Sequence, residues 1–304
     1  MKNIEKTKGI KRLPLSSDIV FKRVFSKEEN KELLKSILEA ILKIRIGSIE
    51  IKNPEIPRDL TSSKAGTLDI KVEINKEMVI DVEMQVEDEN NFDDRSTRYL
   101  ISMSNDELKK GEDYTKTRKT ITISLLNFNY LKRNSFFNVA HMKFEANTET
   151  TYVNMGYKKE DELATEKLEM ITIELPKFKK KNPKADNELN QWLWLIIGEE
   201  EKIKMASKEN EKIKKAIKII DEMSMDPKEW ELYRSRQMAI MNYNIGMKNS
   251  EKKGERKGEK IGEKKTREKI VKNLLNIGLD TEKIIEATGI TKEELKKIEK
   301  EYKK

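Results

Sequence analysis

The chain has 304 residues, of which 39% are charged, and a formal net charge of +8, so it is long enough to bury a sizeable core in one large domain or in one domain with an appendage. It contains no Cys and a single His, which excludes disulfides, Cys-based zinc sites, a thiol nucleophile and a His-rich metal site. Any metal chemistry must therefore use oxygen ligands, which suit hard cations such as Mg²⁺ or Mn²⁺.

Hydropathy gives no sign of membrane insertion. No run of 18 apolar residues occurs, so no transmembrane helix is expected. The first 18 residues are basic but lack the apolar segment of a signal peptide. We therefore expect a cytoplasmic protein with no membrane partner.

The N-terminal part is predicted to be helical from Ser16 to Leu42, with Ser16 or Ser17 as the cap. The stretch LLKSILEAIL places one broad apolar face on this helix, formed by Leu33, Leu34, Ile37, Leu38 and Ile41. Residues 46–57, IGSIEIKNPEIP, indicate a short strand and a turn, because prolines at 54 and 57 interrupt the pattern.

A β-hairpin is predicted over residues 68–86, LDIKVEINKEMVIDVEMQV. The apolar residues of both strands stand at even positions, and cross-strand neighbours must share a face, so the paired residue numbers must add to an even sum. A three-residue loop, 75–77, meets this condition by pairing Ile74 with Met78, whereas a two-residue turn does not. The same register sets Asp69 opposite Glu83.

The pairing of Asp69 with Glu83 raises two alternatives. Directly opposed Cβ atoms lie about 4.5–5.5 Å apart, so two carboxylates there repel each other unless a cation lies between them. Alternatively, the acids simply belong to a solvated sheet face. The cation is favoured because Asp has poor strand propensity and because Gln85 lies beside Glu83 on the same face. Asp81 has Lys71 as its cross-strand partner, and Glu73 is left without a role.

Beyond the hairpin, a helix is predicted from Phe92 to Lys109, ending near Gly111. Strands follow over residues 120–131, 136–144 and 168–175, with LKRNS as a turn. From residue 187 the chain is predicted to be helical, and Trp192 and Trp194 belong to its core. His141 is interpreted as a structural or surface residue. This element order predicts a mixed α/β or α+β core with a helical C-terminal extension.

A period-four repeat, SEKKGERKGEKIGEKK, begins near Ser250. Gly254, Gly258 and Gly262 would form a bare stripe on a helix, but a flexible charged linker is the equal alternative, since each Gly costs roughly 1 kcal/mol in a helix. The predicted division is a domain over 1–240, the repeat as linker or helix over 241–265, and a small helix-turn-helix-like tail over 266–304. In the tail, Gly289 stands at the turn and residues 292–300 offer mostly Lys and Glu. This composition favours oligomerisation or weak phosphate contact over sequence-specific base readout.

Taken together, these motifs resemble the recombination-promoting nuclease and transposase family of the PD-(D/E)XK nuclease superfamily. The resemblance is carried by SSDIVFKRVFS, NPEIP, LDIKVEI, VIDVEMQV and NNFDDRSTRYLISMSNDELKKGEDYTKTRKTITISLLNF. It covers residues 13 to 130 in strong form, and the Gly repeat and tail also match. Gln85 stands where the superfamily usually has Lys.

The resemblance implies a PD-(D/E)XK, restriction-endonuclease-like α/β core with a mixed sheet flanked by helices, and a metal-dependent endonuclease acting on DNA. Asp69, Glu83 and Gln85 would be catalytic, and Asp69, Glu83 and the Met84 carbonyl would hold a divalent cation, with Asp18 as a further candidate ligand. The cation would be Mg²⁺, with Mn²⁺ or Ca²⁺ as alternatives. The residues expected to contact DNA phosphates are Lys22, Arg95 and Tyr99.

Two other functions stay open at this point. A family member with Gln85 in place of a cationic Lys could be catalytically weak or inactive and act by binding DNA or a partner. A purely structural or interaction protein with an acidic sheet edge is the third possibility. The C-terminal helices are candidates for homo-oligomer formation.

Overall fold

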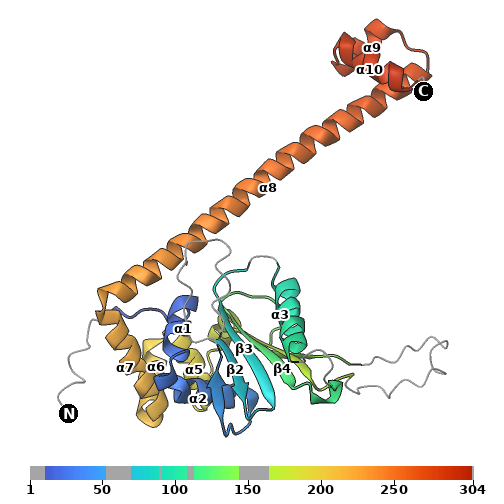
Figure 1. The fold of residues 1–304 in the computed structure, drawn as a ribbon. Coiled ribbons are helices and arrows are strands. Elements are labelled where there is room, and N and C mark those ends of the chain that lie inside the picture. The colour runs from blue at the N-terminus through green and yellow to red at the C-terminus, as the bar shows by residue number, and fades with distance from the viewer. Residues whose placement is uncertain (1–10, 53–69, 89–90, 108–112, 144–163, 303–304) are drawn as a thin grey trace. The chain divides into compact units, whose positions relative to one another are not determined.

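The computed structural model describes residues 11–52, 70–88, 91–107, 113–143 and 164–302 (Figure 1). The chain divides into two compact units, Met1–Gln237 and Met238–Lys304. The helix α8, Pro227–Asn276, begins in the first unit and ends in the second.

A mixed sheet forms the centre of the first unit. Its six strands lie in the order β1-β2-β3-β4-β6-β5 among the described residues. β3, β4 and β6 are parallel neighbours, whereas the pairs β1–β2, β2–β3 and β5–β6 are antiparallel. The strands span Ile49–Ile51 (β1), Ile70–Ile74 (β2), Met78–Gln85 (β3), Lys119–Leu126 (β4), Phe137–His141 (β5) and Leu168–Glu174 (β6).

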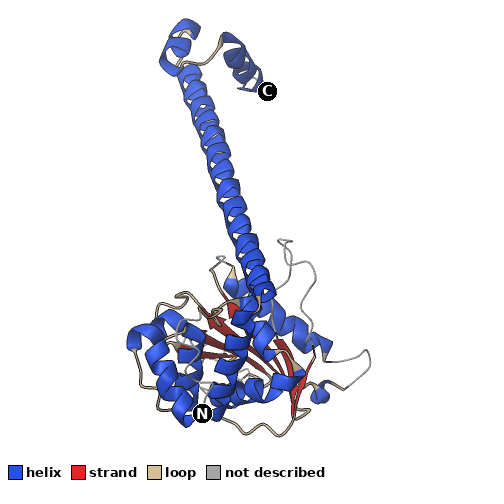
Figure 2. Cartoon of the chain, turned by 90° about the vertical axis from the view of Figure 1, so that its left-hand side faces the viewer, coloured by secondary structure: helices blue, strands red, loops and turns tan. Residues whose placement is uncertain are grey.

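Helices cover the sheet on both faces (Figure 2). One face packs its apolar side chains against a layer of helices, and Trp192 and Trp194 in this layer are fully buried. The layer includes α1 (Asp18–Phe25), α2 (Lys31–Leu42), α4 (Leu175–Lys181), α5 (Glu188–Ile197), α6 (Glu200–Glu209) and α7 (Glu211–Met225). The other face is covered by α3 (Phe92–Asp106), which packs across β4 and β6. The mixed sheet flanked by helices confirms the predicted α/β architecture.

The hairpin has the predicted register. Ile74 pairs with Met78, Val72 with Ile80 and Ile70 with Val82, so the loop is the three-residue segment 75–77. Asn75 and Lys76 take positive φ angles of 53° and 58°. The even-numbered side chains of β2 and β3 enter the main core. Asp69 lies outside the described residues, so its pairing with Glu83 stays a prediction.

Several predicted bounds differ from the structure. The helix predicted over 16–42 is two α-helices, which are joined by a short 3-10 turn at Glu28–Asn30. Ser17 is the cap residue of α1, but its side chain makes no capping bond. The Asp18 carboxylate accepts the Ile19 N–H instead, at 2.7 Å. α3 ends at Asp106 rather than Lys109.

The strand predicted over 120–131 is also shorter than expected. β4 ends at Leu126, because the chain then bends so that the rings of Phe128 and Tyr130 pack on Phe92, with centroids 6.3 and 4.8 Å away. The residues expected as a strand over 136–144 form β5 only from Phe137 to His141. His141 is exposed on this strand.

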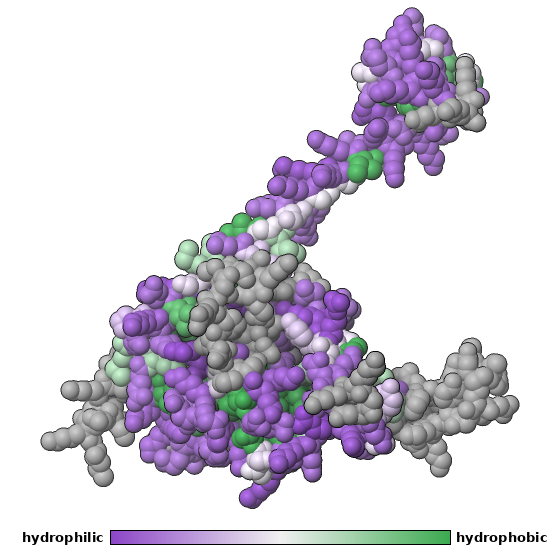
Figure 3. Space-filling view, viewed as in Figure 1, coloured by the Kyte–Doolittle hydropathy of each residue, from purple (hydrophilic) through white to green (hydrophobic). Residues whose placement is uncertain are grey.

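In the second unit, the repeat containing Gly254, Gly258 and Gly262 is part of the helix α8. α9 (Thr281–Thr288) ends at Gly289, whose φ is 64°, and α10 (Lys292–Tyr302) follows. Figure 3 shows that the surface of this unit is mostly hydrophilic. The unit has a small core of its own, formed by Val271, Ile284, Ile290, Leu295 and Ile298.

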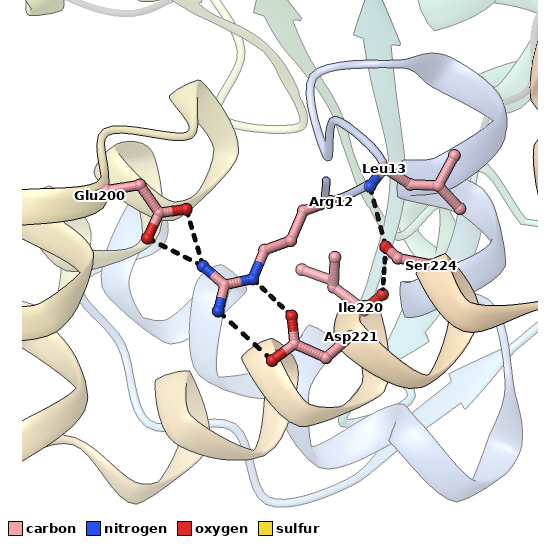
Figure 4. Close-up of polar contacts among 6 residues, drawn as sticks. All are labelled: Arg12, Leu13, Glu200, Ile220, Asp221 and Ser224. Atoms are coloured by element: carbon pink, nitrogen blue, oxygen red, sulfur yellow. Dashed lines mark hydrogen bonds and ion pairs between the residues drawn. The ribbon is translucent and has the colours of Figure 1, made fainter. Parts of the chain in front are cut away.

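The segment that precedes α1 is attached to the helical layer by polar contacts (Figure 4). Arg12 donates through Nη1 to Glu200 at 2.7 Å and through its other nitrogens to Asp221. The Leu13 N–H donates to the Ser224 hydroxyl at 2.9 Å. The two carboxylates raise the pKa of Arg12, chiefly through the hydrogen bond to Asp221.

No helix in the described part of the chain has the length and apolar character needed to cross a membrane.

Candidate active site

The candidate site lies on the polar face of β3. Asp81, Glu83 and Gln85 alternate with core residues along the strand, so their side chains share the face opposite the main core. They are 5%, 2% and 8% exposed. Burial of two carboxylates on one strand is costly without compensating interactions. This face of β3 therefore carries buried polar side chains where a simple core would carry apolar ones.

Hydroxyl side chains of β4 line the same face. In the parallel register, Asp81 pairs with Thr122 and Glu83 pairs with Ser124. The Ser124 hydroxyl donates to Glu83 Oε1 at 3.2 Å. Ser124 is 1% exposed. The Glu83 carboxylate therefore accepts a hydrogen bond from a neutral hydroxyl on the neighbouring strand.

The donor set around Glu83 suits a hard cation. The Gln85 carbonyl accepts from Asn127, on the β4 side, at 2.9 Å. Because successive carbonyls of a strand point to opposite sides, the Met84 carbonyl points toward the β2 side. A carboxylate, a backbone carbonyl and the Gln85 amide are the oxygen donors that Mg²⁺, Mn²⁺ and Ca²⁺ accept.

The predicted metal ligands are only partly described. Asp69 lies outside the described residues. Within the described part of the chain, no group of three or more His, Cys, Asp or Glu side chains is arranged to hold a metal ion. Of the two predicted carboxylate ligands in the hairpin, Glu83 is described and lies on this face of β3. The contribution of Asp69 stays a prediction.

Asp18 is engaged with an arginine. Its Oδ2 atom accepts from Nε and Nη2 of Arg236 on α8, at 2.7 and 2.6 Å. The side chains of Asp18 and Arg236 are 7% and 13% exposed. The carboxylate thus joins the start of α1 to α8, and α1 packs against β3. Its predicted role as a metal ligand stays a prediction.

The predicted phosphate contacts are distributed over two helices. Lys22 on α1 is 3% exposed, so it is buried rather than presented at the surface. Arg95 and Tyr99 lie one turn apart on α3, as expected from their spacing. Tyr99 is 37% exposed, whereas the Nε and Nη2 atoms of Arg95 are buried.

Glu73, which had no role in the sequence, belongs to an ion-pair network at the edge of the same face. Its carboxylate contacts Arg118 at 2.6 Å and Lys52 at 3.2 Å. The hydrogen bond from Arg118 is the main reason why the pKa of Glu73 is lowered. Arg118 also pairs with Glu107, which follows α3. The network therefore connects β1, β2 and the end of α3.

Another buried carboxylate, that of Glu174, lies at the carboxyl end of β6. Glu174 is fully buried, pairs with Lys177 at 2.6 Å and accepts the Tyr130 N–H at 2.7 Å. Burial raises the pKa of the Tyr130 hydroxyl. The full set of partners makes this carboxylate a structural support for the chain after β4.

Sequence reasoning missed Ser124 and Arg236. The alternation of hydroxyl and aliphatic residues in KTITISLL (119–126) was a signal for a polar sheet face. Its pairing with Glu83 needed the strand order. Arg236 lies 218 residues from Asp18, and no local pattern connects them.

Comparison with known proteins gives one match. The model of a family described as PD-(D/E)XK nuclease family transposase matches residues 15–250. No curated protein and no solved structure matches the chain significantly.

Proposed function

The chain belongs to the PD-(D/E)XK nuclease family transposases, and we propose that it is a metal-dependent endonuclease that hydrolyses phosphodiester bonds of DNA, in the setting of recombination, mobile DNA or defence. The observation that carries this proposal is the buried polar face of β3. There the side chains of Glu83 and Gln85, two residues apart on β3, share one face of the strand, and the Ser124 hydroxyl contacts Glu83.

The proposed metal ligands are Asp69, Glu83 and the Met84 carbonyl, and the proposed ion is Mg²⁺, with Mn²⁺ or Ca²⁺ as alternatives. When bound, such a cation activates water and polarises the scissile phosphate. Glu83 supplies a carboxylate group in a site shielded from solvent. Asp18 is the further candidate ligand, and its salt bridge with Arg236 would then compete with the ion.

Gln85 can orient the attacking water or a phosphate oxygen through its amide, which both donates and accepts hydrogen bonds. It carries no charge, so it does not stabilise the negative transition state as a Lys would. For DNA contact we propose Arg95 and Tyr99 on α3, together with Lys22. Phosphate contacts of this kind supply affinity and orientation rather than sequence readout.

The neutral Gln85 favours one alternative, in which the protein binds DNA but cuts it weakly or not at all. Plasmid nicking with and without Mg²⁺ tests the two functions. We expect nicking by the unmodified protein that Asp69→Ala and Glu83→Gln each abolish. Glu77→Gln is the matched control, because Glu77 is exposed in the loop of the same hairpin.

Two results decide against the endonuclease. Nicking that survives both Asp69→Ala and Glu83→Gln would contradict the assigned ligands, and no nicking in any divalent metal would contradict the activity. A salt-dependent shift of a DNA band without cleavage would support the binding alternative, because phosphate contacts release counterions.

We also propose that α8 associates with a second copy of the chain. In residues 251–265 the repeat places a Glu row on one side of the Gly row and a Lys row on the other. Like charges at i, i+4 destabilise a lone helix. A parallel second copy sets each Glu row against a Lys row, whereas an antiparallel copy sets Glu against Glu.

Paired charge reversal tests this association. We expect E255K/E259K to weaken self-association of the full chain in sedimentation velocity. Mixing it with K253E/K257E should restore a dimer. A monomeric unmodified protein at high concentration would contradict the proposal.

A further inference from the structure

The Ser124 hydroxyl on β4 donates a hydrogen bond to the Glu83 carboxylate on β3 at 3.2 Å. Glu83 and Ser124 are direct register partners on β3 and β4. Neighbouring strands lie about 4.8 Å apart, so a Ser side chain at this position reaches a Glu on the same face. From this contact we infer that Ser124 is a positioning residue, which holds the Glu83 carboxylate in the orientation that binds a divalent cation. The inference rests on the proposed function, in which Glu83 is a metal ligand.

The chemistry of the donor supports this role. A hydroxyl orients the carboxylate and leaves its charge unchanged. Partners that orient a metal ligand in this way typically change metal affinity by about 10- to 100-fold when they are removed.

The burial of the pair strengthens the orientation. Glu83 and Ser124 are 2% and 1% exposed, so water competes poorly for the hydrogen bond, and the bond is stronger than it would be at the surface. β4 is a central strand with β3 on one side and β6 on the other. The hydroxyl is therefore presented from one of the most constrained parts of the sheet.

β4 also supplies a matched control. Thr120 lies on the same strand and the same face, is fully buried, and its Oγ1 has no hydrogen-bond partner among the described residues. It pairs with Val79 rather than with a carboxylate. Thr120→Val thus removes a buried hydroxyl from β4 without touching Glu83. Ser124→Thr keeps the hydroxyl, and Ser124→Ala removes it.

The test is calorimetric titration of each full-length variant with Mn²⁺, together with the Mg²⁺ dependence of plasmid nicking. We expect Ser124→Ala to raise the Kd for Mn²⁺ by about tenfold or more. The Mg²⁺ concentration for half-maximal nicking should rise in parallel, and saturating Mg²⁺ should restore most of the rate. Ser124→Thr should bind within about threefold of the unmodified protein, and Thr120→Val should match it.

The result that overturns the inference is Mn²⁺ binding by Ser124→Ala equal to that of Thr120→Val, in a protein whose Glu83→Gln variant has lost binding. The proposed function would survive that outcome. Unchanged Mn²⁺ binding by Glu83→Gln would instead overturn the proposed function and the inference with it. If Ser124→Ala does not fold, Ser124→Cys gives the same comparison, because a thiol is nearly isosteric but a weak donor.

Discussion

The salt bridge between Asp18 and Arg236 gives the sharpest test of how the first unit is held together. Asp18→Asn keeps an oxygen that can accept the Ile19 N–H but removes the charge that receives two donors of Arg236. The guanidinium would then lie 13% exposed beside a neutral amide. The perturbation is therefore confined to one charge at a site that solvent reaches poorly.

The magnitude follows from burial and geometry. Hydrogen bonds to charged groups contribute about 1.5–3 kcal/mol, and breaking a fully buried pair from one side costs about 3–5 kcal/mol. Because Arg236 retains some exposure, we expect Asp18→Asn to lower the free energy of unfolding by about 2 kcal/mol. Glu200→Gln removes the charge of the exposed partner of Arg12 and should change the free energy of unfolding by less than about 0.5 kcal/mol.

Urea unfolding provides the measurement, since the buried Trp192 and Trp194 report on the main core. A double-mutant cycle of Asp18→Asn with Arg236→Gln should give a coupling free energy of about 1.5 kcal/mol. A coupling near zero would refute the argument that this pair joins α1 to α8. In the same variants, Arg236→Gln should tighten Mn²⁺ binding if Asp18 is also a metal ligand.

Three further predictions concern the charge network and the second unit. The lowered pKa of Glu73 means that its stabilisation is present above the pKa of the unfolded chain, about 4.3, and is lost as the pH falls through the folded pKa. Glu73→Gln should therefore lower the free energy of unfolding by under about 1 kcal/mol at neutral pH. In urea unfolding at low pH, the variant and the unmodified protein should be equally stable. A stability difference that grows on acidification would contradict this sign. Replacing Gly254, Gly258 and Gly262 with Ala should add about 1 kcal/mol of helix stability per site in circular dichroism, yet weaken self-association; an unchanged dimer would exclude the Gly row from the contact. Leu295→Ala should cost about 2–5 kcal/mol in the small core of the second unit, so hydrogen exchange should increase in α9 and α10 while β3 and β4 keep their protection.

Local periodicity accounts for the parts of the fold that could be predicted. The five apolar side chains expected on one helix face are buried in α2, and the even-numbered residues of the hairpin enter the core in the predicted register. Helix and strand spacing follow from backbone geometry, so apolar residues at those spacings identify the buried face. The end of β4 was less predictable, because Phe128 and Tyr130, which follow it, pack their rings on Phe92 of α3.

The candidate site divides in the same way. The sequence by itself determined that Glu83 and Gln85 share one face of β3 and that Lys71 faces Asp81, because strand alternation together with a three-residue loop gives this register. Only the tertiary structure decided that β4 adjoins β3, that Ser124 therefore contacts Glu83, and that Arg236 reaches Asp18. Those contacts join segments far apart in the chain, and their partners are selected by the packing of the whole sheet and its helices, which leaves no periodic signal in any one segment.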